Sequence, residues 1–388
     1  MTQYTHITGW GKYIPKVVLT NDDLAEIVDT SNAWIIEHTG IKERHIATGE
    51  ETVAYMSARA ARDALAIAGR TPEDLDLIIV STSSPDRQLP GASFILQGML
   101  GATRAAAFDL RSGCSGVIYS LAVARQFIGS GTYRCVLVVG AEVVLKNVNW
   151  RDRRTCVLFG DGAGAVVLEG SEMPGGILFT GLGAQGKDYQ ALTVKAGGSE
   201  YPMCPITTER NYHTIELDGR KIADFAVRTL LRRPAEAVAG AGLTWDDIEL
   251  FIPHQANLRL IELASERLGI PMERVFVNVD RYANMSTASI AVALTEAAEQ
   301  GRLKAGDHVL LTGFGAGLAW ATAVIRWGAP TEGPPSAAGS GFLGALRRAW
   351  LRIRDRIRRA AVNLSLWSWE LRNRLERRRA DKKKASKK

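Results

Sequence analysis

The sequence predicts an α/β fold in which buried strands alternate with helices around a mostly parallel sheet. Short, nearly continuous apolar runs bounded by turn residues are typical of strands buried on both faces, and they occur at 75–80, 105–110, 135–140 and 247–253. Helical patterns of apolar residues lie between these runs. The pattern also repeats, because Thr71-Pro72-Glu73-Asp74 precedes one strand and Thr244-Trp245-Asp246-Asp247 precedes another. We therefore expect two similar α/β halves.

The first half opens with a strand over residues 4–15 that ends at Pro15. Capping residues before apolar positions predict helix starts at Asn21-Asp22-Asp23-Leu24 and at Thr30-Ser31-Asn32-Ala33. The further elements expected in this half are helices over 52–69 and 91–100, a strand over 105–110, a helix after Cys114, a strand over 135–140, and a glycine-rich turn at 159–164 that leads into a strand.

The second half has a less regular start. Residues 176–216 are strand-like and rich in glycine, and a long helix is expected over 219–241. After the strand at 247–253 and its helix, residues 306–327 should form two strands around Gly313-Phe314-Gly315-Ala316-Gly317. The predicted division is 1–175 for the first half, 176–328 for the second, 329–341 for a linker rich in Pro, Gly and Ser, and 342–388 for a helical tail.

The composition is that of a globular protein, with 388 residues, 46% apolar and 23% charged. The cysteines Cys114, Cys135, Cys156 and Cys204 form no C-x-x-C pair and no zinc spacing, so we expect reduced thiols and no metal site. The N-terminus lacks the pattern of a signal peptide, and no apolar run is long enough for a spanning helix. These features predict a cytoplasmic location.

The net charge of +7 is unevenly distributed. Of the 48 Lys and Arg residues 17 follow residue 328, and of the 41 Asp and Glu residues 5 do, so this segment carries +12 and the rest −5. Residues 342–379 read as one basic amphipathic helix. Its apolar stripe is formed by Leu343, Leu346, Trp350, Ile353, Ile357, Ala360, Leu364, Trp367 and Leu371.

A basic helix with Trp and Leu on one face suits an anionic lipid surface. The tail is therefore expected to hold the protein peripherally at the inner membrane face. An acidic protein partner is one alternative. Self-association as a coiled coil is another, although few acidic residues flank the apolar stripe to offset the arginines. A nucleic acid partner is not expected.

Cys114 lies where a predicted strand passes into a helix, between Gly113 and Ser115-Gly116. A thiolate is the reactive form of cysteine, and a helix N-terminus is expected to lower a thiol pKa through its partial positive charge and free N–H groups. The glycine allows a substrate to approach the backbone. A buried structural cysteine is the alternative interpretation of Cys114 alone.

Two later residues strengthen the catalytic interpretation. His254 follows a buried strand directly, and Asn284 lies in a loop of small residues before a helix. Each has a structural explanation by itself, as a hydrogen-bonded histidine and as a helix N-cap. Together with Cys114 they form an ordered Cys, His, Asn set at the carboxyl ends of predicted strands, where the sites of α/β sheets assemble.

On its motifs the chain resembles the β-ketoacyl-acyl carrier protein synthase III family, condensing enzymes of the thiolase superfamily, over about residues 4–327. The motifs are Thr30-Ser31-Asn32-Ala33-Trp34-Ile35, Gly40-Ile41-Lys42-Glu43-Arg44, Gly113-Cys114-Ser115-Gly116, Phe159-Gly160-Asp161-Gly162-Ala163-Gly164, Pro253-His254-Gln255-Ala256-Asn257, Asn284-Met285-Ser286 and Gly313-Phe314-Gly315-Ala316-Gly317. The resemblance implies a thiolase-like duplicated α-β-α-β-α sandwich with a five-stranded sheet in each half, working as a homodimer.

The resemblance also implies a reaction. Cys114 would attack an acyl-CoA thioester and become acylated. Malonyl-acyl carrier protein would then lose CO2, with His254 and Asn284 donating hydrogen bonds to the enolate. The backbone N–H groups of Cys114 and Ala316 would form the oxyanion hole. The product would be 3-oxoacyl-acyl carrier protein, the first step of fatty acid synthesis, and no metal or redox cofactor would be needed.

Binding roles follow from the same resemblance. Trp34 would stack on the CoA adenine, and Arg153 would help to hold the nucleotide. Arg259 would meet the acidic carrier protein at the mouth of the pantetheine tunnel, and Asn257 would line that tunnel in an architectural role. Leu89 would close the acyl pocket of the partner subunit. The alternatives for these positions are a packing residue at Trp34 and solvated surface charges at Arg153 and Arg259.

Three departures from the family pattern bear on substrate choice. His38 stands where the family usually has Arg, and Leu89 where it often has Phe. Ala283-Asn284-Met285-Ser286 replaces Gly-Asn-Thr-Ser, so Met285 is expected to reshape the pocket. A specialised polyketide or long-chain condensing enzyme is therefore the alternative function. A non-catalytic scaffold anchored by its tail is the alternative from another class, against which the intact Cys, His and Asn argue.

Overall fold

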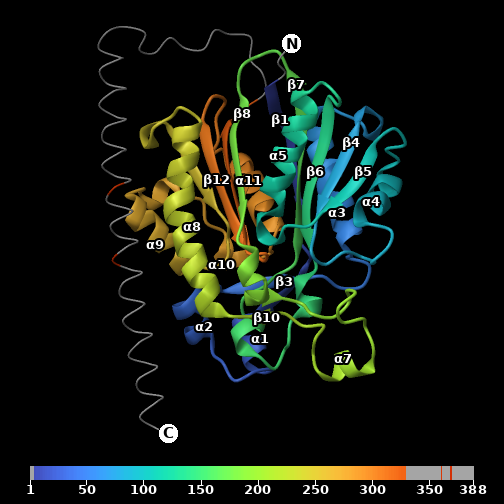
Figure 1. Ribbon diagram of the computed structural model, residues 1–388, viewed down its shortest axis with the longest axis vertical. Coiled ribbons are helices and arrows are strands. Elements are labelled where there is room, and N and C mark those ends of the chain that lie inside the picture. Colours follow the sequence, from blue (N-terminus) through green and yellow to red (C-terminus); the bar gives the residue numbers. More distant parts are fainter. Residues whose placement is uncertain (1–3, 329–359, 361–367, 369–388) are drawn as a thin grey trace.

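The computed structural model describes residues 4–328 together with Ala360 and Ser368. Two β-sheets alternate with three layers of helices, so that the expected α-β-α-β-α sandwich is confirmed (Figure 1). The helices α3 (Val53–Ala68) and α4 (Ala92–Leu100) cover the outer face of the first sheet. The outer face of the second sheet is covered by α8 (Gly219–Gly240), against which α9 (Leu258–Leu268) packs. The helices α5 (Gly116–Gly129) and α11 (Ala288–Glu299) lie between the two sheets.

The first sheet has the strand order β1-β7-β6-β4-β5. Its strands are β1 (Tyr4–Tyr13), β4 (Leu77–Ser81), β5 (Ala106–Leu110), β6 (Cys135–Glu142) and β7 (Gly162–Ser171). β4 pairs in parallel with both β5 and β6, whereas β7 runs antiparallel to β6 and to β1. The carboxyl ends of the parallel strands therefore meet at one edge, where Glu142 ends β6 and Cys114 follows β5.

The second sheet repeats this arrangement with the order β8-β13-β12-β11. Its strands are β8 (Gly176–Ala184), β11 (Leu250–Pro253), β12 (His308–Gly315) and β13 (Ala319–Arg326). β8 pairs antiparallel with β13, β13 antiparallel with β12, and β12 parallel with β11, which matches the first sheet strand for strand. The expected fifth strand is reduced to a single parallel bridge between Phe251 and Val275.

The two sequence repeats before β4 and β11 fold alike. Pro72–Asp74 and Trp245–Asp247 are both 3₁₀ turns. In the first, the Asp74 carboxylate accepts hydrogen bonds from the Thr71 N–H and hydroxyl at 2.8 and 2.9 Å. In the second, Asp247 accepts the same pair from Thr244, both at 2.7 Å. This repeated capping box confirms the predicted duplication.

The expectation of a mostly parallel sheet is wrong, because each sheet mixes parallel and antiparallel pairs. The reason is local. β12 and β13 are separated by the three residues 316–318 and form a hairpin, which needs no helical crossover. The strand-like reading of 176–216 is also correct only in part, since it holds β8, β9 (Leu192–Thr193), α7 (Pro205–Glu209) and β10 (Glu216–Leu217).

The helix starts occur where the capping residues predict them. α1 (Asn21–Ala25) begins after Thr20, whose side chain forms a capping box with Asp23. α2 (Asn32–Thr39) begins after Ser31 and ends at Gly40, which adopts a left-handed φ of 75°. α8 continues through Pro234, which is buried inside the helix.

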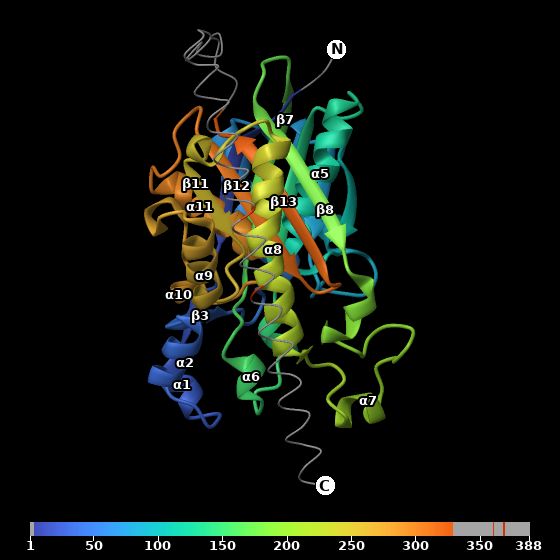
Figure 2. The same ribbon diagram turned by 60° about the vertical axis from the view of Figure 1, so that its left-hand side comes forward.

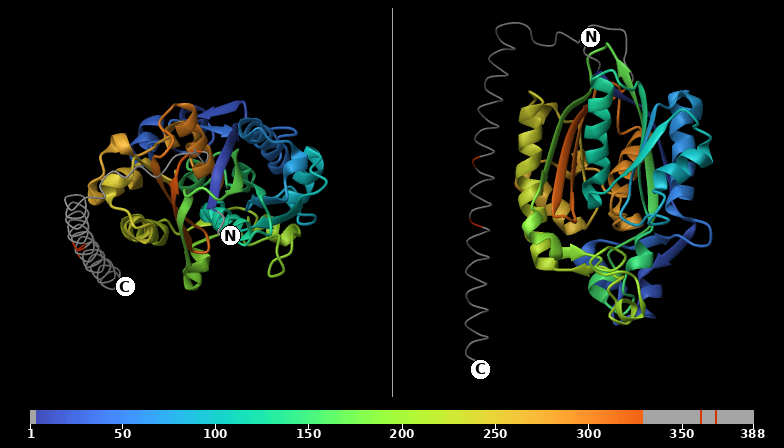
Figure 3. Two further views of the ribbon diagram at one scale, coloured as in Figure 1. Left: turned by 90° about the horizontal axis from the view of Figure 1, so that it is seen from above. Right: turned by 45° about the vertical axis from the view of Figure 1, so that its right-hand side comes forward.

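The insertions between the core elements gather at one end of the molecule, the lower end in Figures 1 and 2. They include α1, α2, α6 (Arg153–Cys156), α7, and the hairpin-like pair of β2 (Val17–Thr20) and β3 (Glu43–Ile46). The right-hand view in Figure 3 shows α11, in orange, between the strands of the two sheets. Ten of its twelve residues are buried, as a central helix between two sheets requires.

No helix within the described part of the chain is long and apolar enough to cross a membrane. The predicted linker 329–341 and the predicted tail 342–388 lie outside the described residues, apart from Ala360 and Ser368. The boundary at 175 between the two halves remains a prediction. It falls between β7, which in chain order is the last strand of the first sheet, and β8, an edge strand of the second sheet.

Candidate active site

Cys114 lies in the 3₁₀ turn Gly113–Ser115, directly before α5. The end of β12 passes very close to it. A Cβ added to Gly315 would lie 2.9 Å from Sγ of Cys114, and a Cβ on Gly113 would lie 2.9 Å from the backbone nitrogen of Ala316. Gly113 also adopts a positive φ of 49°. The glycines of these two distant motifs are thus required by the contact between the turn and β12.

The thiol of Cys114 is 6% exposed. Burial raises its pKa to about 11, although the hydrogen bond between Sγ and the Ser286 hydroxyl and the backbone N–H groups of Cys114 and Ala316 act in the opposite direction. The expectation that the helix start lowers this pKa is therefore wrong, because loss of solvation outweighs the donors. Cys114 rests as a neutral thiol and must give up its proton when it reacts.

A cavity of about 430 Å³ opens at the thiol. Its wall includes Cys114, Ala316, Ser286, Glu142 and Phe159. The backbone N–H groups of Cys114 and Ala316 both hydrogen-bond the sulfur, and their role as an oxyanion hole stays a prediction. Met285 does not line the cavity. It is fully buried in a small cluster with Ala288 and Val292, so the expectation that it reshapes the pocket is wrong.

His254 follows the last residue of β11. Its N–H donates to the carbonyl of Thr312 on β12 at 2.8 Å, and its ring meets Phe314 edge-on at 5.3 Å between centroids. Because Phe314 precedes Gly315, which touches Cys114, strand β12 brings His254 to the same region as the thiol. The imidazole is 1% exposed, and burial lowers its pKa to about 3. It is a neutral ring, suited to donate a hydrogen bond.

Asn284 is 8% exposed and lies in the loop before α11. Its N–H donates to the carbonyl of Leu158 at 2.9 Å, and its side-chain oxygen accepts the N–H of Ser286 at 2.8 Å. With its oxygen engaged, the side chain offers its NH2 group as a donor. Ala283 and Ser286, on either side of Asn284, have positive φ values of 54° and 50°, which are uncommon for residues other than glycine. These two backbone conformations shape the loop that carries Asn284.

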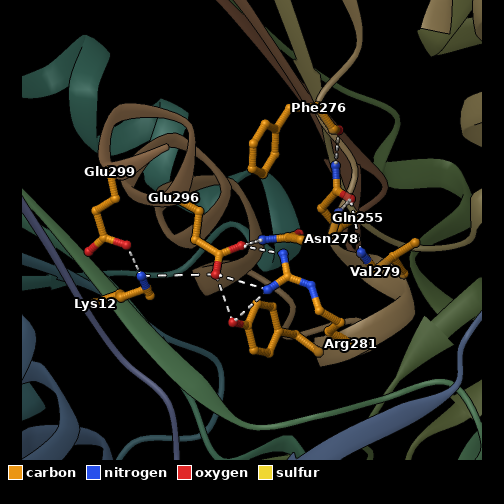
Figure 4. Close-up of polar contacts among 9 residues, drawn as sticks. Lys12, Gln255, Phe276, Asn278, Val279, Arg281, Glu296 and Glu299 are labelled. Atoms are coloured by element: carbon orange, nitrogen blue, oxygen red, sulfur yellow. Dashed lines mark hydrogen bonds and ion pairs between the residues drawn. The ribbon is translucent and has the colours of Figure 1, made fainter. Parts of the chain in front are cut away.

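A buried polar network ties the His254 and Asn284 loops together (Figure 4). Gln255 accepts the N–H groups of Asn278 and Val279 at 3.0 and 3.2 Å and donates to the carbonyls of Pro253 and Phe276. Glu296 on α11 accepts hydrogen bonds from side chains of the segment 278–282, from Asn278 at 3.0 Å, from Arg281 at 2.9 Å and from Tyr282 at 2.7 Å. Asn284 lies two residues beyond the end of this segment.

The residues expected at the CoA nucleotide lie together. The guanidinium of Arg153 is 5.0 Å from the ring centroid of Trp34, and the ring of His38 stacks on Trp34 at 4.3 Å and 22°. Arg153 also donates to the carbonyl of Asp29 at 2.9 Å. His38 therefore places an aromatic ring on Trp34.

The residues expected at the tunnel mouth join α9 to α2. Asn257 caps α9 by accepting the N–H of Arg259 at 2.8 Å, and it donates to the carbonyl of His38 at 3.0 Å. Arg259 donates to the carbonyls of Ile36 and Glu37 at the end of α2. Both side chains therefore fix the two helices against each other.

Leu89 does not line the cavity of its own chain. Its side chain is 86% exposed, although leucine is ordinarily an interior residue.

Sequence reasoning missed Glu142, Ser286, Gln255 and Glu296. Glu142 is the last residue of β6 and is fully buried, and an acidic residue directly after the apolar run 135–141 was the available signal. Gln255 was part of a quoted motif but was given no role. Glu296 carries no local signal, because its partners come from β1 and from the segment that includes α10 (Val279–Tyr282).

Residues 108–186 match the family described as 3-Oxoacyl-[acyl-carrier-protein (ACP)] synthase III, and residues 238–327 match its C-terminal counterpart. A beta-ketoacyl-[acyl-carrier-protein] synthase III of Roseiflexus sp. is 49% identical over 84% of this chain and 99% of its own length. A second from Caldanaerobacter subterraneus is 49% identical over 83% and 97%.

Solved structures agree. The 3-oxoacyl-[acyl-carrier-protein] synthase III of Aquifex aeolicus is 45% identical with a TM-score of 0.77, covering 84% of this chain and all of that one. The priming β-ketosynthase of the R1128 polyketide pathway is 34% identical with a TM-score of 0.79, covering 85% and 98%.

The duplicated sandwich, with a cysteine at a strand-to-helix junction and a histidine and asparagine from the second half, defines a thiolase-like condensing enzyme. Within that class the chain belongs to the β-ketoacyl-acyl carrier protein synthase III family. It is therefore an acyltransferase-type enzyme, and the alternative of a non-catalytic scaffold is set aside.

Proposed function

We propose that this enzyme condenses an acyl-CoA primer with malonyl-acyl carrier protein to give 3-oxoacyl-acyl carrier protein, through an acyl intermediate on Cys114. The observation that carries the proposal is the Cys114 thiol at the wall of a cavity that also holds the backbone of Ala316. A thioester carbonyl bound there would receive the sulfur, and its oxygen would accept two backbone hydrogen bonds. The reaction initiates fatty acid synthesis and uses no metal or redox cofactor.

In the second half-reaction, His254 and Asn284 donate hydrogen bonds to the thioester oxygen of the malonyl group. A neutral imidazole and an amide with its oxygen already engaged are both donors without charge. They stabilise the enolate that forms when CO2 leaves. The carbanion then attacks the acyl group on Cys114. Trp34 and Arg153 hold the CoA nucleotide, and Arg259 and Asn257 shape the entrance to the tunnel.

We further propose a homodimer. Leu89 and Phe94 are 86% and 55% exposed, and apolar side chains of this size favour burial against a partner. Leu89 then closes the acyl pocket of the second subunit, and its small size admits a longer or branched acyl chain. A specialised polyketide primer is the second candidate, favoured by the 34% identity to the R1128 priming enzyme.

The segment after residue 328 is proposed to bind an anionic membrane surface. Its net charge of +12 and its apolar stripe support this role.

Intact mass spectrometry tests the acyl intermediate. The protein is incubated with acyl-CoAs that differ in chain length and branching, and the added mass identifies the primer. Cys114→Ala is expected to abolish the adduct, while Cys204→Ala, which changes the exposed cysteine, leaves it unchanged. An adduct that persists on Cys114→Ala refutes the mechanism.

The enolate assignment has a separate test. His254→Ala and Asn284→Ala should still be acylated on Cys114, but decarboxylation of malonyl thioester should fall by about a hundredfold, the usual loss for an oxyanion donor. Release of CO2 and the mass of the acyl-enzyme are measured on the same samples. Wild-type decarboxylation by both variants would show that other groups stabilise the enolate.

A further inference from the structure

A chain of hydrogen bonds leads from the Cys114 thiol into the protein interior. Sγ donates to the hydroxyl oxygen of Ser286 at 3.5 Å, and that hydroxyl donates to Oε1 of Glu142 at 3.0 Å. The three residues come from the turn before α5, the loop before α11 and the end of β6. Both bonds point the same way, from sulfur to carboxylate, which is the polarity needed to carry a proton.

The Glu142 carboxylate is solvated only by neutral groups. It is 0% exposed and accepts the N–H of Ser83 at 3.0 Å and the hydroxyls of Ser84 and Thr82 at 2.5 and 3.4 Å. Within residues 4–328 no lysine or arginine forms an ion pair with it. Burial therefore raises its pKa, which makes it a better proton acceptor than an ordinary carboxylate.

Two anions cannot easily coexist at this site. The negative charge of Glu142 itself raises the pKa of Cys114, so a thiolate forms at least cost when the carboxylate is neutralised. The other titratable group at the cavity is Arg111, which follows β5, while His254 beyond β11 is a poor base with its pKa of about 3. Ser286 lies between Cys114 and Glu142 and hydrogen-bonds both, so a proton shared by the two groups can pass through its hydroxyl.

We propose that Ser286 relays the thiol proton of Cys114 to Glu142 when the cysteine becomes a nucleophile. The inference rests on the proposed function for the identity of the electrophile, an acyl thioester. The S–H bond breaks, the proton passes to Ser286 as the hydroxyl proton passes to Glu142, and the freed sulfur pair forms the bond to the acyl carbon. When the carbon–sulfur bond to CoA breaks, the departing sulfur takes the proton back along the same chain. Glu142 acts through Ser286 and is a positioning residue, because it does not touch the reacting atoms.

The test is the pH profile of Cys114 alkylation by iodoacetamide, followed by peptide mass spectrometry. If Glu142 accepts the thiol proton, the reactive thiolate of Cys114 forms while the Cys114–Glu142 pair still holds one proton. The alkylation rate of the wild type should therefore reach a plateau well below the thiol pKa of about 11. Ser286→Ala and Glu142→Gln should lose this plateau, and their alkylation rates should rise continuously with pH until the thiol itself ionises. Ser84→Ala removes a hydrogen bond from the other carboxylate oxygen but leaves the relay intact, so it should keep the plateau.

Acylation gives the second readout. With acetyl-CoA or isobutyryl-CoA, Ser286→Ala should slow the loading of Cys114 by about tenfold to a hundredfold, the range expected for loss of proton transfer. Circular dichroism and urea unfolding of Ser286→Ala, compared with the wild type, show whether the variant is folded. If Glu142→Gln does not fold, Ser286→Ala decides alone, because it removes a single hydroxyl.

The proposal is overturned if Ser286→Ala keeps both the plateau and the acylation rate. It is also overturned if His254→Ala loses the plateau and Ser286→Ala keeps it, since His254 would then be the acceptor. Alkylation needs no acyl-CoA. If no acyl-CoA loads the wild-type enzyme but the plateau still depends on Ser286, the relay stands and the proposed function fails.

Discussion

Cys114 and His254 are both nearly fully buried, and burial keeps both of them neutral. The thiol pKa rises to about 11, and the imidazole pKa falls to about 3. In each case the shift arises because a low-dielectric surrounding disfavours the charged form. A neutral thiol needs a proton acceptor, and a neutral imidazole can donate a hydrogen bond through its single N–H group. The roles of these residues follow from their depth in the fold.

The buried imidazole makes stability depend on pH. Its folded pKa of about 3 lies below the unfolded value of 6.5, so the unfolded chain binds the proton first as the pH falls. Its contribution to stability is complete above about pH 6.5 and declines toward about pH 3, by at most about 1.4 kcal/mol per pH unit. Urea unfolding at several pH values should show a steeper acid loss for the wild type than for His254→Gln. Equal slopes would mean that the ring is protonated in the folded state.

At the scale of elements, β12 organises the site. The carbonyl of Thr312 holds the backbone of His254, the ring of Phe314 meets the imidazole, and Gly315 touches Cys114. α11 contributes from the other side, since Asn284 and Ser286 precede its first turn and Glu296 lies near its last. A strand and a helix of the second half therefore position groups around a cysteine of the first.

Glu296 is expected to matter for both stability and the second half-reaction. Its side chain is 6% exposed and accepts hydrogen bonds from Asn278, Arg281 and Tyr282. Glu296→Ala leaves these donors unpaired and should lower the free energy of unfolding by about 1–3 kcal/mol. Because the segment they belong to leads into Asn284, decarboxylation should fall more than acylation of Cys114.

Glu299→Ala is the matched control for Glu296→Ala. Glu299 is 48% exposed and pairs with the same Lys12, so its removal should change stability by less than about 1 kcal/mol. Chemical unfolding and the two half-reactions are measured for both variants. Equal effects of the two substitutions would show that the network does not position Asn284.

At the scale of the whole molecule, the two halves share one architecture but divide the chemistry. In the proposed mechanism the nucleophile Cys114 comes from the first half, and the donors to the enolate, His254 and Asn284, come from the second. In both halves the functional groups follow strands at equivalent places, since Glu142 ends β6 and Gly315 ends β12, its counterpart in the second sheet. Exposed Leu89 is the feature that a single chain leaves unexplained.

The segment after residue 328 should give the protein an affinity for anionic lipid. Sedimentation with anionic and with neutral vesicles is compared for the full chain and for a chain that ends at Ala329. The full chain should bind anionic vesicles at low salt and be released at high salt, because surface charge is screened. Condensing activity should survive the truncation, since each catalytic motif precedes Gly328. Equal binding by the truncated chain would contradict this role.

The sequence by itself determined most of the elements and helix starts, and it predicted which residues react. A cap such as Ser31 acts within one helical turn, and an apolar run such as 135–140 requires burial by its composition alone. Short-range patterns were therefore enough to place them. The Thr–Asp repeats at 71 and 244 likewise revealed the duplication, because a capping box is a local structure. The Cys, His and Asn motifs were recognised as a family pattern.

Only the tertiary structure decided which strands run antiparallel, which way the pKa of Cys114 shifts, and what supports the catalytic residues. The pKa depends on burial by elements more than a hundred residues away, and this outweighs the local effect of a helix start. The side chain of Met285 packs into a buried cluster with Ala288 and Val292, which only the tertiary structure reveals. The hydrogen bond between Ser286 and Glu142 joins residues 144 positions apart, and a pattern of neighbouring residues in the sequence does not reveal such a long-range contact.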